Sequence, residues 1–184
     1  RFDSNEEGLD LGGKGKGLSI LYLYGFSVPA FMVITPTSLE DFLSKPSKHI
    51  EWMSESPKAV RSSGMKEDGE EHSYAGQYDT FLNQKTEDEI VKAVRDCVAS
   101  ARSNRVKQYN DEKGQVNASE GIAVIIQDMV DAKYAGVAFS VDPVNHRRDM
   151  ICVNIVEGLG DKLVDGKIEP ESLVINKYDS DPVV

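Results

Sequence analysis

The stretch that decides the fold runs from residue 59 to residue 83 and reads AVRSSGMKEDGEEHSYAGQYDTFLN. It opens with Ala59–Ser63, a short apolar segment typical of a strand, and closes with a second short strand, Tyr78–Leu82. Between them, Gly64–Gln77 is a polar segment with three glycines and many acidic residues. The stretch therefore predicts two strands separated by a long polar loop.

Two parts of this stretch could bind an anion. Arg61 comes from an apolar strand, which would project its bidentate donor fork from a rigid element. The small residues of Ala75–Thr80 could let the backbone fold over an anion. The alternative is a structural arginine paired with Glu67 or Asp68, and the local sequence alone favours that alternative.

A glycine- and lysine-rich segment, Gly12–Gly17, precedes the deciding stretch, and Leu18–Tyr24 continues it as a predicted short helix. Gly25 is expected to end that helix in a left-handed conformation. Glycines let backbone N–H groups approach phosphate oxygens, and Lys14 or Lys16 could add a point charge. The alternative is a flexible, solvated loop.

The same segment does not fit the common phosphate-binding motifs. Gly8, Gly13 and Lys14 are spaced as in a Walker A loop, but Gly15 stands where a Ser or Thr must hold magnesium. Apolar residues stand where a dinucleotide-binding loop requires its third glycine. Phosphate binding here must therefore rest on another pattern.

The remaining segments predict an α+β fold. Thr86–Tyr109 is the best predicted helix, since Thr86 and Glu89 form a capping box ahead of an apolar stripe. A second helix is expected over Ser38–Leu43, and Ser44–Lys58 is expected to be a loop or weak helix. Further strands are expected over Phe26–Thr35, Ile122–Met129, Val137–Asp142, Met150–Glu157 and Ser172–Lys177. This order favours helices on one face of an antiparallel or mixed sheet.

The last third offers groups that could contact a flat base and its sugar. Gln127 and Met129 could present an amide and a soft apolar side chain to a base. Glu157, which ends a strand, could accept ribose hydroxyls. The alternatives are an ordinary strand end with a core methionine and a plain turn.

Composition limits the class of protein. The chain has 184 residues, 40% of them hydrophobic, which is enough for the core of one domain, built as one body or two lobes. A net charge of -10 argues against non-specific nucleic-acid binding. Cys97 and Cys152 fit no metal or redox motif, and no signal peptide or membrane span is recognisable. A cytoplasmic location is expected, with no metal site on the three histidines.

Taken in order, these segments resemble the N-terminal ATP-binding domain of pyruvate phosphate dikinase and phosphoenolpyruvate synthase. The resemblance covers nearly the whole chain, and the wording of Ser73–Asn83 is closer to the synthase and rifampin-phosphotransferase branch. The matching segments are Gly12–Gly15 with Leu18, Gly25–Pro29, Ala59–Ser63 with Glu67 and Asp68, Ser73–Asn83, Gln127–Val130, Ala135–Pro143 and Glu157–Gly160.

The resemblance implies an ATP-grasp fold, in which two lobes clamp ATP. It also implies that ATP phosphorylates a histidine on a separate domain, which then serves pyruvate or a related acceptor. The ATP contacts that it implies are Lys14 and Arg61 at the phosphates, Gly76 and Thr80 in the loop over them, Gln127 and Met129 at the adenine, and Glu157 at the ribose.

The sequence departs from this family pattern in three places. Leu43–Ala59 is shorter than the family's usual insert, and Gly64, Met65 and Lys66 replace the small residues that typically follow Ser63. No counterpart of the family's later acidic, magnesium-binding segment or of its histidine-bearing domain occurs before Val184. The resemblance therefore implies an ATP-grasp domain incomplete at its C-terminal end, with Mg²⁺ ligands outside the chain, weak nucleotide binding and no turnover by the chain alone.

Two other functions stay open at this point. The chain could be a non-catalytic ATP-grasp-like module for regulation or protein interaction. It could also be the ATP domain of a glucan-type dikinase. The phosphate acceptor and the oligomeric state are not fixed by the sequence.

Overall fold

The computed structural model describes residues 10–51, 55–64, 80–111, 121–164 and 166–178, with the side chains of 102–111 left aside. The chain divides into two compact units, Arg1–Met129 and Val130–Val184, which are described separately below. Within the described residues, no helix has both the length and the apolar character that a membrane span requires.

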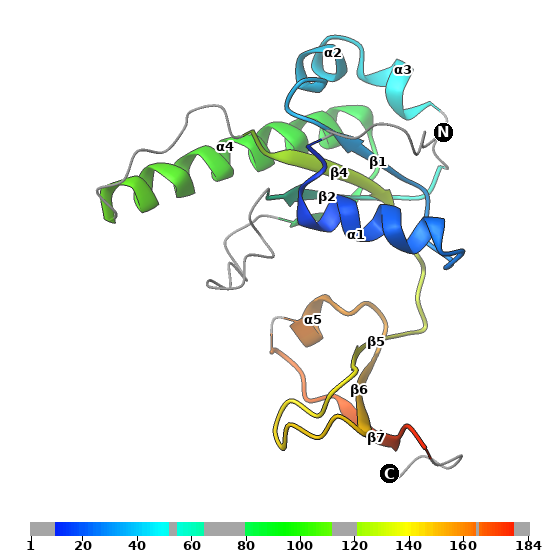
Figure 1. Ribbon diagram of the computed structural model, residues 1–184. Coiled ribbons are helices and arrows are strands. Elements are labelled where there is room, and N and C mark those ends of the chain that lie inside the picture. Colours follow the sequence, from blue (N-terminus) through cyan, green and yellow to red (C-terminus); the bar gives the residue numbers. More distant parts are fainter. Residues whose placement is uncertain (1–9, 52–54, 65–79, 112–120, 165, 179–184) are drawn as a thin grey trace. The chain divides into compact units, whose positions relative to one another are not determined.

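The first unit is built on a four-stranded antiparallel sheet in the order β1-β4-β2-β3 (Figure 1). Its central strand, β4, is buried along Ala123–Gln127, which agrees with the continuous apolar run in the sequence. Three predicted strands are confirmed here with shifts of one or two residues: β2 is Lys58–Ser63, β3 is Thr80–Gln84 and β4 is Ala123–Asp128. The strand predicted over Phe26–Thr35 is shorter, since β1 is Phe31–Ile34.

The hydrophobic core lies on one face of this sheet, under the long helix α4, Glu87–Asp111. The predicted capping box is confirmed, because the Thr86 amide donates to Glu89 Oε2 over 3.0 Å and the Glu89 amide donates to Thr86 Oγ1 over 3.2 Å. The buried core residues are Ile34, Phe42, Val60, Ile90, Ala93, Val94, Cys97, Val124 and Ile126.

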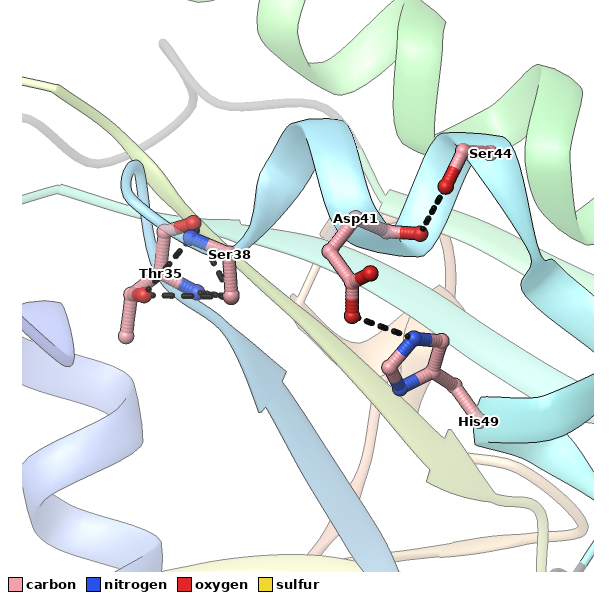
Figure 2. A network of polar contacts seen from close by, with 5 residues as sticks. All are labelled: Thr35, Ser38, Asp41, Ser44 and His49. Atoms are coloured by element: carbon pink, nitrogen blue, oxygen red, sulfur yellow. Dashed lines mark hydrogen bonds and ion pairs between the residues drawn. The ribbon is translucent and has the colours of Figure 1, made fainter.

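The short helices α2, Leu39–Ser44, and α3, Pro46–Ile50, lie at the edge of this core, and a contact between Asp41 and His49 joins them (Figure 2). Ser38 precedes α2 but does not cap it, since its hydroxyl accepts the Thr35 amide over 2.9 Å. His49 Nε2 lies 3.0 Å from Asp41 Oδ2, which ties α3 back to α2. The expected weak helix in this region is therefore α3.

The opposite face of the sheet carries α1, Gly12–Leu23, which contacts β2 and β4 (Figure 1). A Cβ on Gly15 would lie 3.5 Å from both methyl carbons of Val33, whose side chain alternates with the core residue Ile34. The expectation of helices on one face is therefore wrong. The reason is that β4 is apolar on both faces, so both faces need cover.

The glycine-rich segment also differs from the expectation of a loop, since α1 begins at Gly12 and includes all of Gly12–Gly17. The end of the helix agrees with the prediction. Gly25 has a φ of +80°, and its amide and that of Phe26 bond back to carbonyls of the last turn.

The second unit is a three-stranded antiparallel sheet in the order β5-β6-β7 with one short helix, α5, Asp161–Val164. The predicted β6 is confirmed at Met150–Glu157, and β7 is Glu171–Asn176. Strand β5 is Tyr134–Phe139, three residues earlier than predicted. Asp142 lies instead in the β5–β6 turn, where its carboxylate accepts the Val144 and Asn145 amides.

Candidate functional site

Arg61 lies near the middle of β2, on the face of the sheet that α1 covers. Its neighbour Val60 belongs to the core on the other face, so alternation along the strand places Arg61 opposite to that core. The side chain is half-buried, and Arg61 Nε is buried without a hydrogen-bond partner among the described residues. Burial lowers the pKa of the guanidinium below its ordinary value.

The pairing alternative for Arg61 involves Glu67 or Asp68, and both lie outside the described residues. What the described residues show is a cation on a rigid strand with an unused donor. A buried donor without a partner is costly, and an anionic ligand would supply the missing acceptor. The arrangement therefore suits an oxyanion.

Thr80 is the cross-strand neighbour of Arg61. The two residues are register partners on β3 and β2, and side chains directly opposite each other in an antiparallel pair lie on the same face. Thr80 is exposed, so its hydroxyl is available beside the guanidinium. Gly76, the other residue expected in this loop, lies outside the described residues.

Lys14 belongs to the first turns of α1, on the same side of the sheet as Arg61. The start of this helix is fastened to the end of β2, since the Gly13 amide donates to the Gly64 carbonyl over 2.9 Å. The side chain of Lys14 is exposed. Lys14 thus lies on the helix that covers the sheet face of Arg61, and its ammonium is a charge that could meet a phosphate.

Gln127 is buried on β4, with 8% of its surface exposed, and shares the face of Arg61. Its register partners are Ala59 on β2 and Phe31 on β1, and Arg61 pairs with Ile125 two residues away. Since alternate residues on a strand share a face, Gln127 lies on the Arg61 side of the sheet. An amide and a guanidinium are thus presented on one surface.

Met129 follows β4 and has a structural contact of its own. Its Sδ accepts the Asn83 amide over 3.0 Å, and its amide donates to the Pro57 carbonyl over 2.8 Å. Asn83 has a φ of +59°, a conformation that Asn tolerates better than most residues. Met129 therefore links the end of β4 to β3 and to the residue that precedes β2.

Lys58 and Asp128 form a buried charged pair in this unit that was not among the residues expected from the sequence. These register partners of β2 and β4 lie with Nζ 2.9 Å from Oδ1, and their side chains are only 6% and 12% exposed. The pair stands directly beside Ala59 and Gln127, on the opposite face. Only the antiparallel register of β2 and β4 brings the two residues together, and no local spacing indicates it.

Glu157 ends β6 in the second unit, where it is exposed and pairs with Tyr134. It therefore belongs to a different unit from Lys14, Arg61, Thr80 and Gln127. Among the described residues, no group of three or more His, Cys, Asp or Glu is arranged to hold a metal ion.

The first unit is thus an α+β domain with the cationic side chain of Arg61 and the amide of Gln127 on one face of its sheet. Comparison with known families agrees with this class. The model of the family described as "Pyruvate phosphate dikinase, AMP/ATP-binding domain" matches residues 45–184. The chain belongs to this family, which confirms the resemblance drawn from the sequence.

Several curated proteins are similar to the chain over about the same length. The chain is 42% identical over 119 residues to the prodigiosin synthesizing transferase PigC of Serratia marcescens, which is 65% of this chain and 13% of PigC. It is 39% identical over 119 residues, 14% of that protein, to the uncharacterized phosphotransferase YvkC of Bacillus subtilis. It is 39% identical over 121 residues to the phosphoenolpyruvate synthase of Aeropyrum pernix, 66% of this chain and 15% of that enzyme.

These relatives are much longer than the region they share with the chain. The chain spans 13%, 14% and 15% of the three proteins named. They support an ATP-binding domain of a phosphoenolpyruvate-synthase-like phosphotransferase family.

Proposed function

We propose that this chain binds ATP, with the phosphates on the α1 face of the first sheet. Arg61 and Lys14 contact the phosphates, Thr80 and Gly76 belong to the loop that covers them, and Gln127 contacts the adenine. Met129 lies beside the base, and Glu157 of the second unit contacts the ribose. The fold proposed for this binding is ATP-grasp.

One observation carries this proposal. Arg61 is a half-buried cation whose Nε has no partner among the described residues, and it shares a sheet face with Thr80, Gln127 and α1. A guanidinium is planar, permanently charged and able to bind two phosphate oxygens at once. A nucleotide polyphosphate would satisfy that donor, and an amide on the same face could meet the base.

The proposed role in phosphoryl transfer follows from the family. We propose that bound ATP phosphorylates a histidine on a separate domain, which passes the phosphoryl group to pyruvate or a related acceptor. Arg61 and Lys14 would neutralise the charge of the terminal phosphates and hold them in position. Mg²⁺ would enter with ATP and would help to neutralise the charge that develops on its phosphates.

Calorimetric titration of the 184-residue chain with MgATP tests the binding proposal. Arg61→Ala should weaken binding about tenfold or more, since a hydrogen bond to a charged group contributes about 1.5–3 kcal/mol. Arg95→Ala is the matched control, because Arg95 is exposed on α4, whose buried side packs on the opposite face of the sheet. Equal affinities for the unmodified chain and Arg61→Ala would contradict the proposed phosphate contact.

A further inference from the structure

The start of α1 lacks a local cap. Leu11 stands at the N-cap position and makes no side-chain hydrogen bond to the first turn. The first amides of a helix have no carbonyl partner within it, and Ser, Thr, Asp or Asn at the N-cap normally supplies one. A segment with glycines at 12, 13, 15 and 17 also has low helix propensity. Something outside the segment must therefore stabilise this helix start.

Ser63, at the end of β2, holds this helix start by bridging its first turn. Its hydroxyl donates to the Leu11 carbonyl over 2.9 Å and accepts the Gly15 amide over 3.1 Å. These are the two atoms that an α-helix would otherwise join directly, four residues apart. The Ser63 side chain is completely buried, so the contact is shielded from water.

The packing around Ser63 requires a glycine at position 12. A Cβ on Gly12 would lie 2.3 Å from Ser63 Oγ, and Gly12 has a φ of +67°. Only glycine combines that backbone conformation with so close an approach. The Gly13 amide adds a bond to the Gly64 carbonyl over 2.9 Å. The end of β2 therefore fixes both the position and the direction of the helix start.

Ser63 also links the two phosphate contacts of the proposed function. Arg61 and Ser63 lie on one face of β2, two residues or about 7 Å apart along the strand. Lys14 lies between Gly13 and Gly15, the residues whose amides are held by Gly64 and Ser63. The strand that carries Arg61 thus holds the backbone that carries Lys14.

We infer that Ser63 is a positioning residue for nucleotide binding: its buried hydroxyl sets the first turn of α1 and thereby fixes the backbone that carries Lys14 over the sheet face of Arg61. This inference rests on the proposed function and adds to it a residue that acts through Lys14. Ser63 itself is enclosed by protein and does not contact the nucleotide.

A double-mutant cycle with MgATP tests the inference. Ser63→Ala should weaken MgATP binding about tenfold, in the range expected for losing buried hydrogen bonds. In the Lys14→Ala background, the same change should have less than about a twofold effect, because residues that act as one unit are not additive. Ser62→Ala is the matched control, since Ser62 is also buried but lies on the opposite face of β2. It should leave MgATP affinity unchanged.

Amide hydrogen exchange gives a second readout that does not need nucleotide. Ser63→Ala should speed exchange at Gly13 and Gly15, whereas Ser62→Ala should leave both amides protected. Unchanged protection in Ser63→Ala would overturn the inference. A loss of affinity that persists at full size in the Lys14→Ala background would also overturn it, because Ser63 would then act independently of Lys14.

The failure of this inference can be told from failure of the proposed function. If the unmodified chain gives no response to millimolar MgATP, the proposed function fails and the inference fails with it. If the unmodified chain binds and Arg61→Ala weakens binding, but Ser63→Ala does not, only the inference is overturned.

Discussion

The two units of the chain are both antiparallel sheets, but they bury their side chains very differently. The first unit has helices on both faces of its sheet and buries nearly all of β4. In the second unit, Val156 is the one buried hydrophobic residue among those described, while Tyr134, Phe139 and Val174 remain exposed. The first sheet is stabilised by a core, whereas the second depends more on its strand ladder and turns.

This difference bears on the proposed nucleotide contacts. A half-buried cation such as Arg61 needs a rigid surround, because its desolvation must be offset by fixed neighbours and a ligand. The first unit provides that surround through β2, β4 and α1. In the second unit, Glu157 stands on an exposed strand end and carries no comparable desolvation cost. The comparison predicts that substitutions in the first unit have the larger effects.

The largest effect is expected at Lys58. Lys58→Met removes the ammonium 2.9 Å from the buried Asp128 carboxylate, and breaking a buried ion pair costs about 3–5 kcal/mol of unfolding free energy. Urea denaturation followed by circular dichroism measures the change. The double variant Lys58→Met/Asp128→Leu is the control and should recover most of the loss. If Lys58→Met cost less than about 1 kcal/mol, the pair would not stabilise the first sheet.

A smaller effect is expected from matched isoleucines in the two units. Ile126→Ala in the core of the first unit should cost about 3 kcal/mol, since the site is fully buried. Ile175→Ala, at a half-buried position of β7, should cost about 1 kcal/mol. The same denaturation experiment compares them. Equal costs would contradict the view that the first unit alone has a well-packed core.

The smallest effect is expected from acid titration of two carboxylates. Hydrogen bonds from the Lys85 and Thr86 amides lower the pKa of Glu89, and those from the Asn145 side chain and backbone lower the pKa of Asp142. A lowered pKa in the folded state stabilises above the unfolded-state value, about 4, and that stability is lost as pH falls through the folded value. The melting temperature of the chain should therefore decrease as the pH is lowered below about 4.

Two variants assign that acid sensitivity to the units. Glu89→Gln should reduce the pH dependence of the first unit, and Asp142→Asn that of the second, as followed by amide exchange between about pH 5 and pH 2.5. Acid sensitivity that is the same in both variants and in the unmodified chain would show that neither carboxylate contributes.

Much of the fold could be predicted because its signals are local. The capping box at Thr86 and Glu89 is a pattern of adjacent residues, and β6 follows from a continuous run of strand-forming residues. The sequence pattern predicts strand β5 three residues later than the structure has it, because the bounds of this strand depend on its pairing with β6. A Cβ on Gly136 would lie 2.5 Å from the Asn154 carbonyl oxygen, so this close pairing with β6 requires the glycine.

For the candidate site, the sequence by itself determined which residue types are present and in what order, and that order sufficed to identify the family. Tertiary structure alone decided which of them share a surface. The register of β2 with β3 and β4 places Arg61, Thr80 and Gln127 on one face. Tertiary structure also decided that Gly12–Gly17 is helical. Glycine has a weak helix propensity, and Ser63 and Gly64 supply the hydrogen bonds that hold the Gly15 and Gly13 amides. Local sequence sets such preferences, but hydrogen bonds between distant residues settle them.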